Sequence, residues 1–303
     1  MNDINFDGRV AVVTGAGTGL GRSHAKALAA RGAKVIVNDI GGAVDGSGVS
    51  DNAAASVVAE IIDAGGQAFA HGANVCIDTE VQDMVAMALT KWGTIDILVN
   101  NAGILRDKSF AKMPLADFKA VVDVHLIGSA NCAKAVWEPM REQKYGRIAM
   151  TSSSSGLYGN FGQSNYGAAK LGVIGLMNVL HLEGEKYGIK VNALAPTAAT
   201  RMTKNLLPEE ALELLTVESV SAGLVYLVSE DSPSRLILCA GAGGYAATRI
   251  YETEGVCLPV GEQTAENVAL HINDIINPKS QHSYIQGAQQ TMKFVEKAAA
   301  LKK

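Results

Sequence analysis

Short apolar runs alternate with helical stretches along most of this 303-residue chain. The apolar runs are rich in Val, Ile, Leu and Ala on both faces, which is typical of parallel strands buried between two layers. Parallel strands need long crossover connections, and helices provide them. The alternation therefore predicts an α/β fold, a doubly wound parallel sheet with helices on both faces. Strands are expected at residues 10–14, 34–38, 67–71, 97–99, 147–151, 190–194 and 236–239, and helices at 21–30, 52–64, 81–92, 118–143 and 165–187.

The rhythm of strands and helices ends near residue 255. Residues 1–255 are therefore expected to form a single domain, and residues 256–303 a helical C-terminal extension. Helices are expected in it near 265–276 and 285–299. We expect the extension to pack on the same domain or on a dimer partner.

Composition excludes several classes of protein. Apolar residues make up 48% of the chain and charged residues 18%, so a sizeable core can be buried. A net charge of −4 gives no basic footprint for nucleic acid. No apolar run reaches the ~18–20 residues that would span a bilayer. No signal segment precedes the first strand, and the terminal AAALKK is no peroxisomal SKL-type address. The four cysteines form no CxxC pair, which favours a reduced, cytoplasmic location and no metal site.

A glycine-rich turn, TGAGTGLG at 14–21, joins the first expected strand to the first helix. Glycines let the backbone turn sharply and approach a pyrophosphate, while the helix N-terminus offers free N–H groups to the anion. A glycine string alone is weak evidence, but this one lies between a strand and a helix, as a Rossmann-type dinucleotide site requires. The predicted cofactor-binding residues of the turn are Gly15, Gly17, Thr18, Gly19, Leu20 and Gly21.

Asp39 lies at the end of the second expected strand, twenty residues after Gly19. A carboxylate there can accept hydrogen bonds from the adenosine ribose hydroxyls and would repel the 2′-phosphate of NADP, so we expect NAD. The glycine-rich segment 41–50 is either a surface insertion or part of the cofactor site. Loops after the other strands should line the same crevice. The cofactor-binding residues predicted outside the glycine turn, besides Asp39, are Asn74, Val75, Asn101, Ala102, Gly103, Pro196 and Thr197.

Tyr166 and Lys170 stand four residues apart in one expected helix, so both side chains can point into the crevice. A free tyrosine has a pKa near ~10 and is a poor base at neutral pH. The Lys170 ammonium and the positive charge of an oxidised nicotinamide should lower that pKa, so that Tyr166 accepts the alcohol proton as hydride leaves. Lys170 should also hold the nicotinamide ribose, which makes this pair cofactor-binding as well as catalytic. Ser153, in the TSSSSG run, can hydrogen-bond the substrate oxygen, although spacing alone does not choose among the four serines.

The ordered set of TGxxxGxG, NNAG, an upstream serine and YxxxK resembles the short-chain dehydrogenase/reductase family. The resemblance implies an enzyme that acts on a CH–OH group, with Ser153, thirteen residues before the tyrosine, as its catalytic serine beside Tyr166 and Lys170. Many members have an asparagine in a VNLxG stretch, where it organises a water for proton relay. This chain has VHLIG at 124–128. His125 either takes that place or is a buried structural residue.

The chain resembles more closely the (3R)-hydroxyacyl-CoA dehydrogenase part of the type 2 peroxisomal multifunctional enzymes, also called 17-beta-hydroxysteroid dehydrogenase type 4. This subgroup implies oxidation of a (3R)-3-hydroxyacyl-CoA to the 3-ketoacyl-CoA with NAD, in fatty acid metabolism. It also implies a homodimer or homotetramer, here as a stand-alone dehydrogenase whose tail shapes the substrate cleft. The similar strings are VNDIGG (37–42), NNAGILRDKSF (100–110), VHLIGS (124–129), KYGRIAMTSSSSGLYGNFGQSNYGAAKLG (144–172), RMT (201–203), EQTAENV (262–268) and NPKS (277–280).

Several alternatives stay open. Arg106, Lys108 and Lys112 either meet CoA phosphates through charge-assisted hydrogen bonds or form a solvated basic face. A hydroxysteroid or a steroid-side-chain CoA ester could enter an apolar cleft equally well, because one fold serves many substrates. A catalytically silent nucleotide-binding scaffold subunit is the rival of another class. The presence of all three catalytic residues argues against it.

Overall fold

The computed structural model describes residues 3–48, 50, 52–200 and 208–302. The RMT string at 201–203 therefore lies outside the described residues. Contacts within the chain divide it into two compact units, Met1–Ala247 and Thr248–Lys303. No helix in the described ranges is both long enough and apolar enough to cross a membrane.

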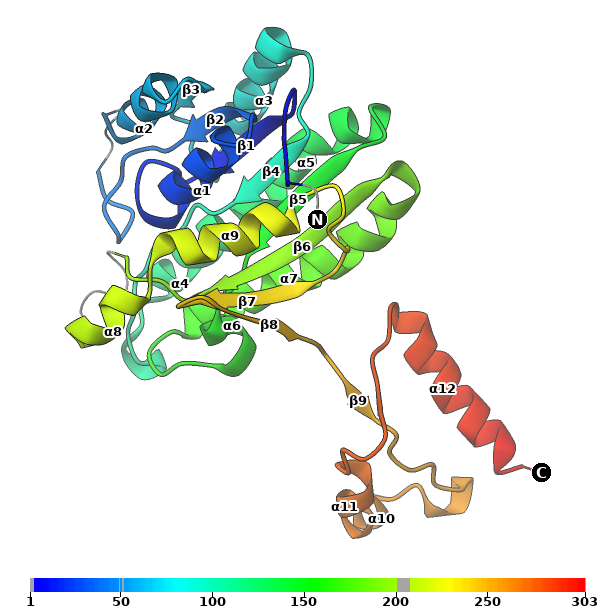
Figure 1. Ribbon diagram of the computed structural model, residues 1–303. Coiled ribbons are helices and arrows are strands. Elements are labelled where there is room, and N and C mark those ends of the chain that lie inside the picture. The colour runs from blue at the N-terminus through cyan, green and yellow to red at the C-terminus, as the bar shows by residue number, and fades with distance from the viewer. Residues whose placement is uncertain (1–2, 49, 51, 201–207, 303) are drawn as a thin grey trace. The chain divides into compact units, whose positions relative to one another are not determined.

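An eight-stranded sheet with the order β3-β2-β1-β4-β5-β6-β7-β8 organises the first unit (Figure 1). Strands β1 to β7 pair in parallel, and the chain winds outward in both directions from the β1–β4 pair. The predicted doubly wound α/β fold is confirmed. The strands are β1 (Val10–Thr14), β2 (Lys34–Asn38), β3 (Gln67–His71), β4 (Ile97–Asn100), β5 (Gly146–Thr151), β6 (Ile189–Pro196), β7 (Ile237–Gly241) and β8 (Gly244–Thr248).

Two apolar cores, one on each face of the sheet, explain why the strands are apolar throughout. Ala11 and Val13 of β1 belong to one core, while Val10 and Val12 belong to the other. Successive side chains of a strand point to opposite faces, so both faces must be apolar when helices cover both. The helices of the first face are α1 (Gly19–Ala29), α2 (Asn52–Asp63) and α9 (Val217–Leu227), and those of the second are α3 (Asp78–Trp92), α5 (Gly128–Glu142) and α7 (Ser164–Gly184).

The helix predicted at 118–143 is interrupted. Helix α4 (Leu115–Val122) passes into a π-helical turn, Asp123–Ile127, before α5 begins at Gly128. Such local widenings of a helix are frequent at functional sites. This turn carries His125, which is 2% exposed. The shorter helices of the first unit are α6 (Ser154–Tyr158), α8 (Glu209–Leu214) and the 3₁₀ turns Phe110–Lys112 and Glu185–Tyr187.

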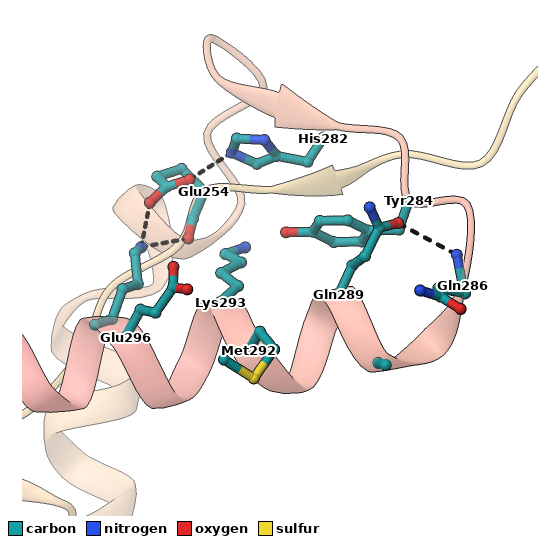
Figure 2. Close-up of a pocket in the computed structure, with 10 residues that line it drawn as sticks. Glu254, His282, Tyr284, Gln286, Gln289, Met292, Lys293 and Glu296 are labelled. Atoms are coloured by element: carbon teal, nitrogen blue, oxygen red, sulfur yellow. Dashed lines mark hydrogen bonds and ion pairs between the residues drawn. The ribbon is translucent and has the colours of Figure 1, made fainter.

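The second unit contains both helical regions predicted for the C-terminal extension. Lys293 and Lys297 of its last helix form ion pairs of 2.9 and 2.6 Å with Glu252 and Glu254 of the strand segment beside it. Figure 2 shows Glu254 and Lys293 at this helix. None of its described residues is buried, so this unit has no core of its own. Its elements are β9 (Glu252–Thr253), a 3₁₀ turn (Val260–Glu262), α10 (Ala265–Leu270), α11 (Ile272–Ile275), β10 (Gln281–His282) and α12 (Gly287–Ala300).

A buried histidine lies where α1 packs against α9. His24 is 0% exposed, and its Nδ1 lies 2.8 Å from the hydroxyl oxygen of Ser221. Its Nε2 is buried with no hydrogen-bonding partner in the described part of the chain. Burial lowers the pKa of His24 from 6.5 to about 3, so the ring is neutral in the folded protein near neutral pH.

We expect the free energy of unfolding to decrease as the pH falls from 6.5 towards 3. In this window the unfolded chain binds a proton at His24 and the folded chain does not, so acid favours unfolding. The loss from this group at pH 4 is about 3 kcal/mol, at ~1.4 kcal/mol per pH unit. Denaturant titrations at several pH values would measure it, with His24→Asn as a variant that cannot titrate. Equal pH slopes for the two proteins would contradict this prediction.

Candidate active site

The carboxyl ends of the parallel strands border one cleft of about 440 Å³, as expected for an open α/β sheet. It brings together fourteen of the predicted site residues, contributed by turns after five strands and by α7. Gly17, Ser153 and Thr197 are predicted site residues that do not line it. The predicted residues that do line it are Gly15, Thr18, Gly19, Leu20, Gly21, Asp39, Asn74, Val75, Asn101, Ala102, Gly103, Tyr166, Lys170 and Pro196.

The glycine turn and the NNAG loop form one rigid cradle. A Cβ atom on Gly21 would lie 2.1 Å from the carbonyl oxygen of Gly15, and one on Gly15 would lie 2.7 Å from the Cα of Ala102. The Asn101 amide donates to the carbonyls of Thr14 and Gly15, each over 3.0 Å. The Thr14 hydroxyl oxygen accepts from the backbone N–H groups of Asn101 and Ala102, also over 3.0 Å. Only glycine leaves room for this close approach of the two loops.

Asp39 is held in place by backbone donors. Its Oδ2 accepts from the N–H of Gly17 over 2.7 Å, and its Oδ1 from the N–H of Gly41 over 2.6 Å. Each carboxylate oxygen keeps acceptor capacity for a ribose hydroxyl. A Cβ on Gly17 would lie 2.9 Å from that Oδ2 and 2.7 Å from the Cβ of Ala53. Gly17 therefore supports Asp39 through its backbone, and its predicted contact with the cofactor stays a prediction.

The segment 41–50 belongs to the site. Its residues Gly42, Ala43, Val44 and Gly46 line the cleft. The carbonyl of Val44 accepts from the N–H of Leu105 over 2.9 Å, and the carbonyl of Asp45 accepts from the Arg106 guanidinium over 2.9 Å. Of the two interpretations of this segment, the structure favours the role near the cofactor.

Ser153 and Tyr166 are joined by a hydrogen bond between their side chains. Ser153 caps the N-terminus of α6, where its hydroxyl oxygen accepts from the N–H of Ser155 over 3.2 Å. Tyr166 lies in the first turn of α7. Among the four serines, Ser153 is the one that the structure joins to Tyr166, and its catalytic role stays a prediction.

The electrostatics of Tyr166 differ from the prediction. Burial raises the pKa of this phenol, the hydrogen bond with Ser153 opposes the rise, and the charge of Asp107 adds to it. Lys170 is not among the groups that shift the pKa of Tyr166, and burial lowers the pKa of this amine from 10.5 to about 7. Its Nζ lies 5.5 Å from the centre of the Tyr166 ring and donates to the Thr151 carbonyl over 2.6 Å. The YxxxK spacing predicts that Tyr166 and Lys170 lie together, but it does not show how burial shifts their pKa values.

Other predicted residues fall outside the cleft or at its rim. Thr197 uses its backbone N–H to bond the Ala240 carbonyl over 2.8 Å, so it joins β6 to β7 instead of lining the cleft. Of the three basic residues after NNAG, Arg106 alone lines the cleft. Its Nη1 lies 3.1 Å from Oδ1 of Asp117. Lys108 lies 3.5 Å from the same carboxylate. The cleft residues that the sequence reasoning missed include Ile40, Ala73, Cys76, Ile104, Ala120, Asp123, Val124, Thr151 and Thr200.

The sequence profile of short chain dehydrogenases matches residues 9–211, which contain the glycine turn, NNAG, Ser153 and the YxxxK pair. The chain belongs to the short-chain dehydrogenase/reductase family. As a member with the Ser153, Tyr166 and Lys170 set in place, it is an oxidoreductase.

Two relatives extend over most of the chain. A short-chain type dehydrogenase/reductase of Mycobacterium tuberculosis is 48% identical over 248 residues, which cover 82% of this chain and 87% of that protein. Peroxisomal multifunctional enzyme type 2 of Mus musculus is 51% identical over 228 residues, which cover 75% of this chain and 31% of that enzyme. The chain thus spans about a third of the mouse enzyme, and the predicted similarity to this group is confirmed.

Two solved structures share the fold. Full-length peroxisomal multifunctional enzyme type 2 from Drosophila melanogaster has a TM-score of 0.83 at 35% identity, covering 98% of this chain and 51% of that one. A 7α-hydroxysteroid dehydrogenase, solved with NADH and 7-oxo glycochenodeoxycholic acid, has a TM-score of 0.72 at 29% identity, covering 80% of this chain and 98% of that one.

We expect Gly21→Ala to raise the KM for the dinucleotide at least about tenfold, because the added methyl group overlaps the Gly15 carbonyl at the floor of the cradle. Gly175→Ala is the matched control. Gly175 is also a helical glycine, in α7, and a Cβ there would have no atom within 4 Å. Steady-state kinetics with varied dinucleotide would measure both variants. A normal KM in Gly21→Ala would show that the turn does not carry the cofactor.

Proposed function

We propose that this enzyme oxidises a secondary alcohol with NAD and that the alcohol is a (3R)-3-hydroxyacyl-CoA, which becomes the 3-ketoacyl-CoA. One observation carries the proposal. Tyr166, which is hydrogen-bonded to Ser153, lines the same cleft as the glycine cradle and Asp39. A proton acceptor and a dinucleotide site therefore face one another across a single space.

The cleft residues fit a nicotinamide dinucleotide. The glycine cradle would leave room for the pyrophosphate at the N-terminus of α1, and the Asp39 carboxylate would accept from the adenosine ribose hydroxyls. Lys170 would hold the nicotinamide ribose. Bound NAD supplies the hydride acceptor and a positive charge next to the phenol. The NADH in the related 7α-hydroxysteroid dehydrogenase supports the same class of cofactor.

The protein groups handle the proton. The Ser153 hydroxyl would orient the substrate oxygen, and Tyr166 would accept the hydroxyl proton as the hydride leaves the same carbon, which leaves a ketone. Burial, together with the charge of Asp107, raises the pKa of Tyr166, so the reaction needs positive charge close to the phenol. Lys170, with a pKa of about 7, carries that charge only in part near neutral pH. We therefore propose that loading of the cofactor, rather than Lys170 alone, makes Tyr166 a competent base.

The choice of acyl-CoA rests on the resemblance to the hydroxyacyl-CoA dehydrogenase part of the type 2 peroxisomal multifunctional enzymes. The matched region of the mouse and Drosophila proteins belongs to peroxisomal multifunctional enzymes type 2, and the match extends over 98% of this chain in the Drosophila structure. Arg106 lines the cleft, and its guanidinium could bind a CoA phosphate once its ion pair with Asp117 is broken.

A substrate panel tests the proposal, with NADH formation followed at 340 nm. It sets (3R)- and (3S)-3-hydroxyacyl-CoAs of several lengths beside steroid alcohols and steroid-side-chain CoA esters. We expect turnover of the (3R) thioesters, and a fall in kcat of about 10²- to 10⁴-fold in Tyr166→Phe with dinucleotide binding retained. Undiminished activity in Tyr166→Phe would refute the proton path.

The rival substrates have their own support. The related 7α-hydroxysteroid dehydrogenase was solved with a bile acid, so a steroid alcohol is the second candidate. Turnover of steroids without turnover of hydroxyacyl-CoA would favour it. Binding of dinucleotide with no turnover of any alcohol would favour the silent scaffold subunit.

We expect a preference for NAD over NADP of at least about 100-fold in kcat/KM, because the 2′-phosphate would meet the Asp39 carboxylate. Asp39→Asn keeps the shape and removes the charge, so the preference should shrink by about tenfold or more. The ratio of kcat/KM for the two dinucleotides measures this. Equal efficiency of the wild-type enzyme with both would overturn the choice of NAD.

We also propose that the enzyme works in the cytoplasm as a homodimer or homotetramer, in which the extension packs on the same domain or on the partner. The free cysteines of the described chain fit a reducing compartment. The exposed Leu270 and Phe294 of the second unit, 74% and 52% exposed, offer apolar area for such packing.

A further inference from the structure

Gln163 is a buried polar residue three positions before Tyr166, and the proton transfer described above does not use it. It is 8% exposed and directly precedes α7. Its backbone carbonyl accepts from the N–H of Gly167 over 2.7 Å, so its main chain is part of the first turn of the helix that carries Tyr166. Its side chain does not cap this helix, and it bonds to other segments of the chain instead.

The two ends of the Gln163 amide make different bonds. Its Oε1 accepts from the Ser155 hydroxyl over 2.7 Å and from the Asn160 amide over 3.2 Å. Its Nε2 donates to Oδ2 of Asp107 over 2.7 Å. An ionised carboxylate can only accept, so Asp107 fixes the orientation of the amide. This position therefore needs an acceptor on one side and a donor on the other.

The Ser155 end of the amide leads to the catalytic hydroxyls. The N–H of Ser155 donates to the hydroxyl oxygen of Ser153 over 3.2 Å, and Ser153 is hydrogen-bonded in turn to Tyr166. Gln163, Ser155, Ser153 and Tyr166 thus form a closed ring, in which the backbone of the first turn of α7 is the last side. In this ring, which we call the Gln163 ring, the glutamine side chain ties α6 to the start of α7.

The Asp107 end of the amide ties the Gln163 ring to the segment that follows NNAG. A second bond joins the same two segments, because the amide of the buried Asn165 donates to the carbonyl of Arg106 over 3.0 Å. Arg106 lines the cleft. The Gln163 ring is therefore held against the wall of the cleft that faces the substrate and the dinucleotide.

We propose that Gln163 is a positioning residue that sets the spacing of the Ser153 and Tyr166 hydroxyls and fixes both to the cleft wall through Asp107. Gln163 is not among the residues that line the cleft, so it acts through these two hydroxyls. The substrate oxygen must meet both at once, and small errors in such a geometry slow the chemical step. This inference rests on the proposed function, because alcohol oxidation is the reaction that it serves.

Reversing donor and acceptor tests the bond between Gln163 and Asp107. Gln163→Glu keeps an acceptor for Ser155 but sets a second carboxylate against Asp107, and we expect kcat for alcohol oxidation to fall by about 10- to 100-fold. Adding Asp107→Asn gives the carboxylate an amide donor again, so kcat of the double variant should return to within about fivefold of wild type. Gln82→Glu is the matched control, because Gln82 donates to Asp78 over 2.6 Å on the exposed side of α3. Its kcat should stay within about twofold of wild type.

A pH profile separates spacing from charge. The negative charge of Asp107 raises the pKa of Tyr166, and a further carboxylate at position 163 would act in the same direction. A loss of kcat from this cause alone would disappear at high pH, where the phenol loses its proton in spite of the added charge. A loss of spacing persists at every pH, so we expect the lower kcat of Gln163→Glu on the alkaline plateau as well.

Two results would overturn the proposal: full recovery of Gln163→Glu at high pH, or a double variant no faster than Gln163→Glu. The KM for NAD should stay within about threefold in all variants, because no dinucleotide contact changes. Thermal unfolding and NADH binding show which variants fold. If Gln163→Glu does not fold, Gln163→Met decides, since it removes the bonds without adding charge: a kcat at least about tenfold lower supports the proposal and an unchanged kcat refutes it.

The two proposals fail in different ways. A wild-type enzyme that oxidises no alcohol would refute the proposed function itself. An active enzyme whose kcat is undiminished in Gln163→Glu would refute only the role of Gln163.

Discussion

The clamp between Thr14 and Asn101 is the interaction on which the site depends. Thr14 ends strand β1 and Asn101 follows the neighbouring strand β4, where the winding of the sheet changes direction. Four hydrogen bonds of 3.0 Å tie the glycine turn to the NNAG loop, so neither loop can move alone. The dinucleotide cradle and the mouth of the cleft both follow from this junction.

The strands could be predicted because a strand buried on both faces is apolar at nearly every position. Val10 to Thr14 are all buried, and the predicted limits of that strand match the structure. The glycine turn, Asp39, NNAG and the YxxxK pair could be placed because each lies next to a strand end or a helix start. Helix α9 was not predicted, although Val217, Val220, Leu224 and Leu227 follow a helical spacing. In the structure it packs on α1.

The features that escaped prediction depend on the packed structure. The support that Gly17 gives to Asp39 depends on how the turn packs against Ala53, which no local pattern contains. The pKa values of Tyr166 and Lys170 respond first to burial, which spacing does not reveal. The π-helical turn at His125 likewise follows from no local pattern that the sequence analysis used.

Arg106 connects the two walls of the cleft. Its guanidinium binds the Asp45 carbonyl on the segment beside Asp39 and the Asp117 carboxylate at the start of α4. An anionic ligand that drew Arg106 away from Asp117 would disturb both walls in one movement. By thermodynamic linkage, the factor by which this ligand changes the affinity for the dinucleotide equals the factor by which the dinucleotide changes the affinity for the ligand. Arg106 would thereby set the size of the coupling between the two halves of the cleft, which is the same whichever ligand arrives first.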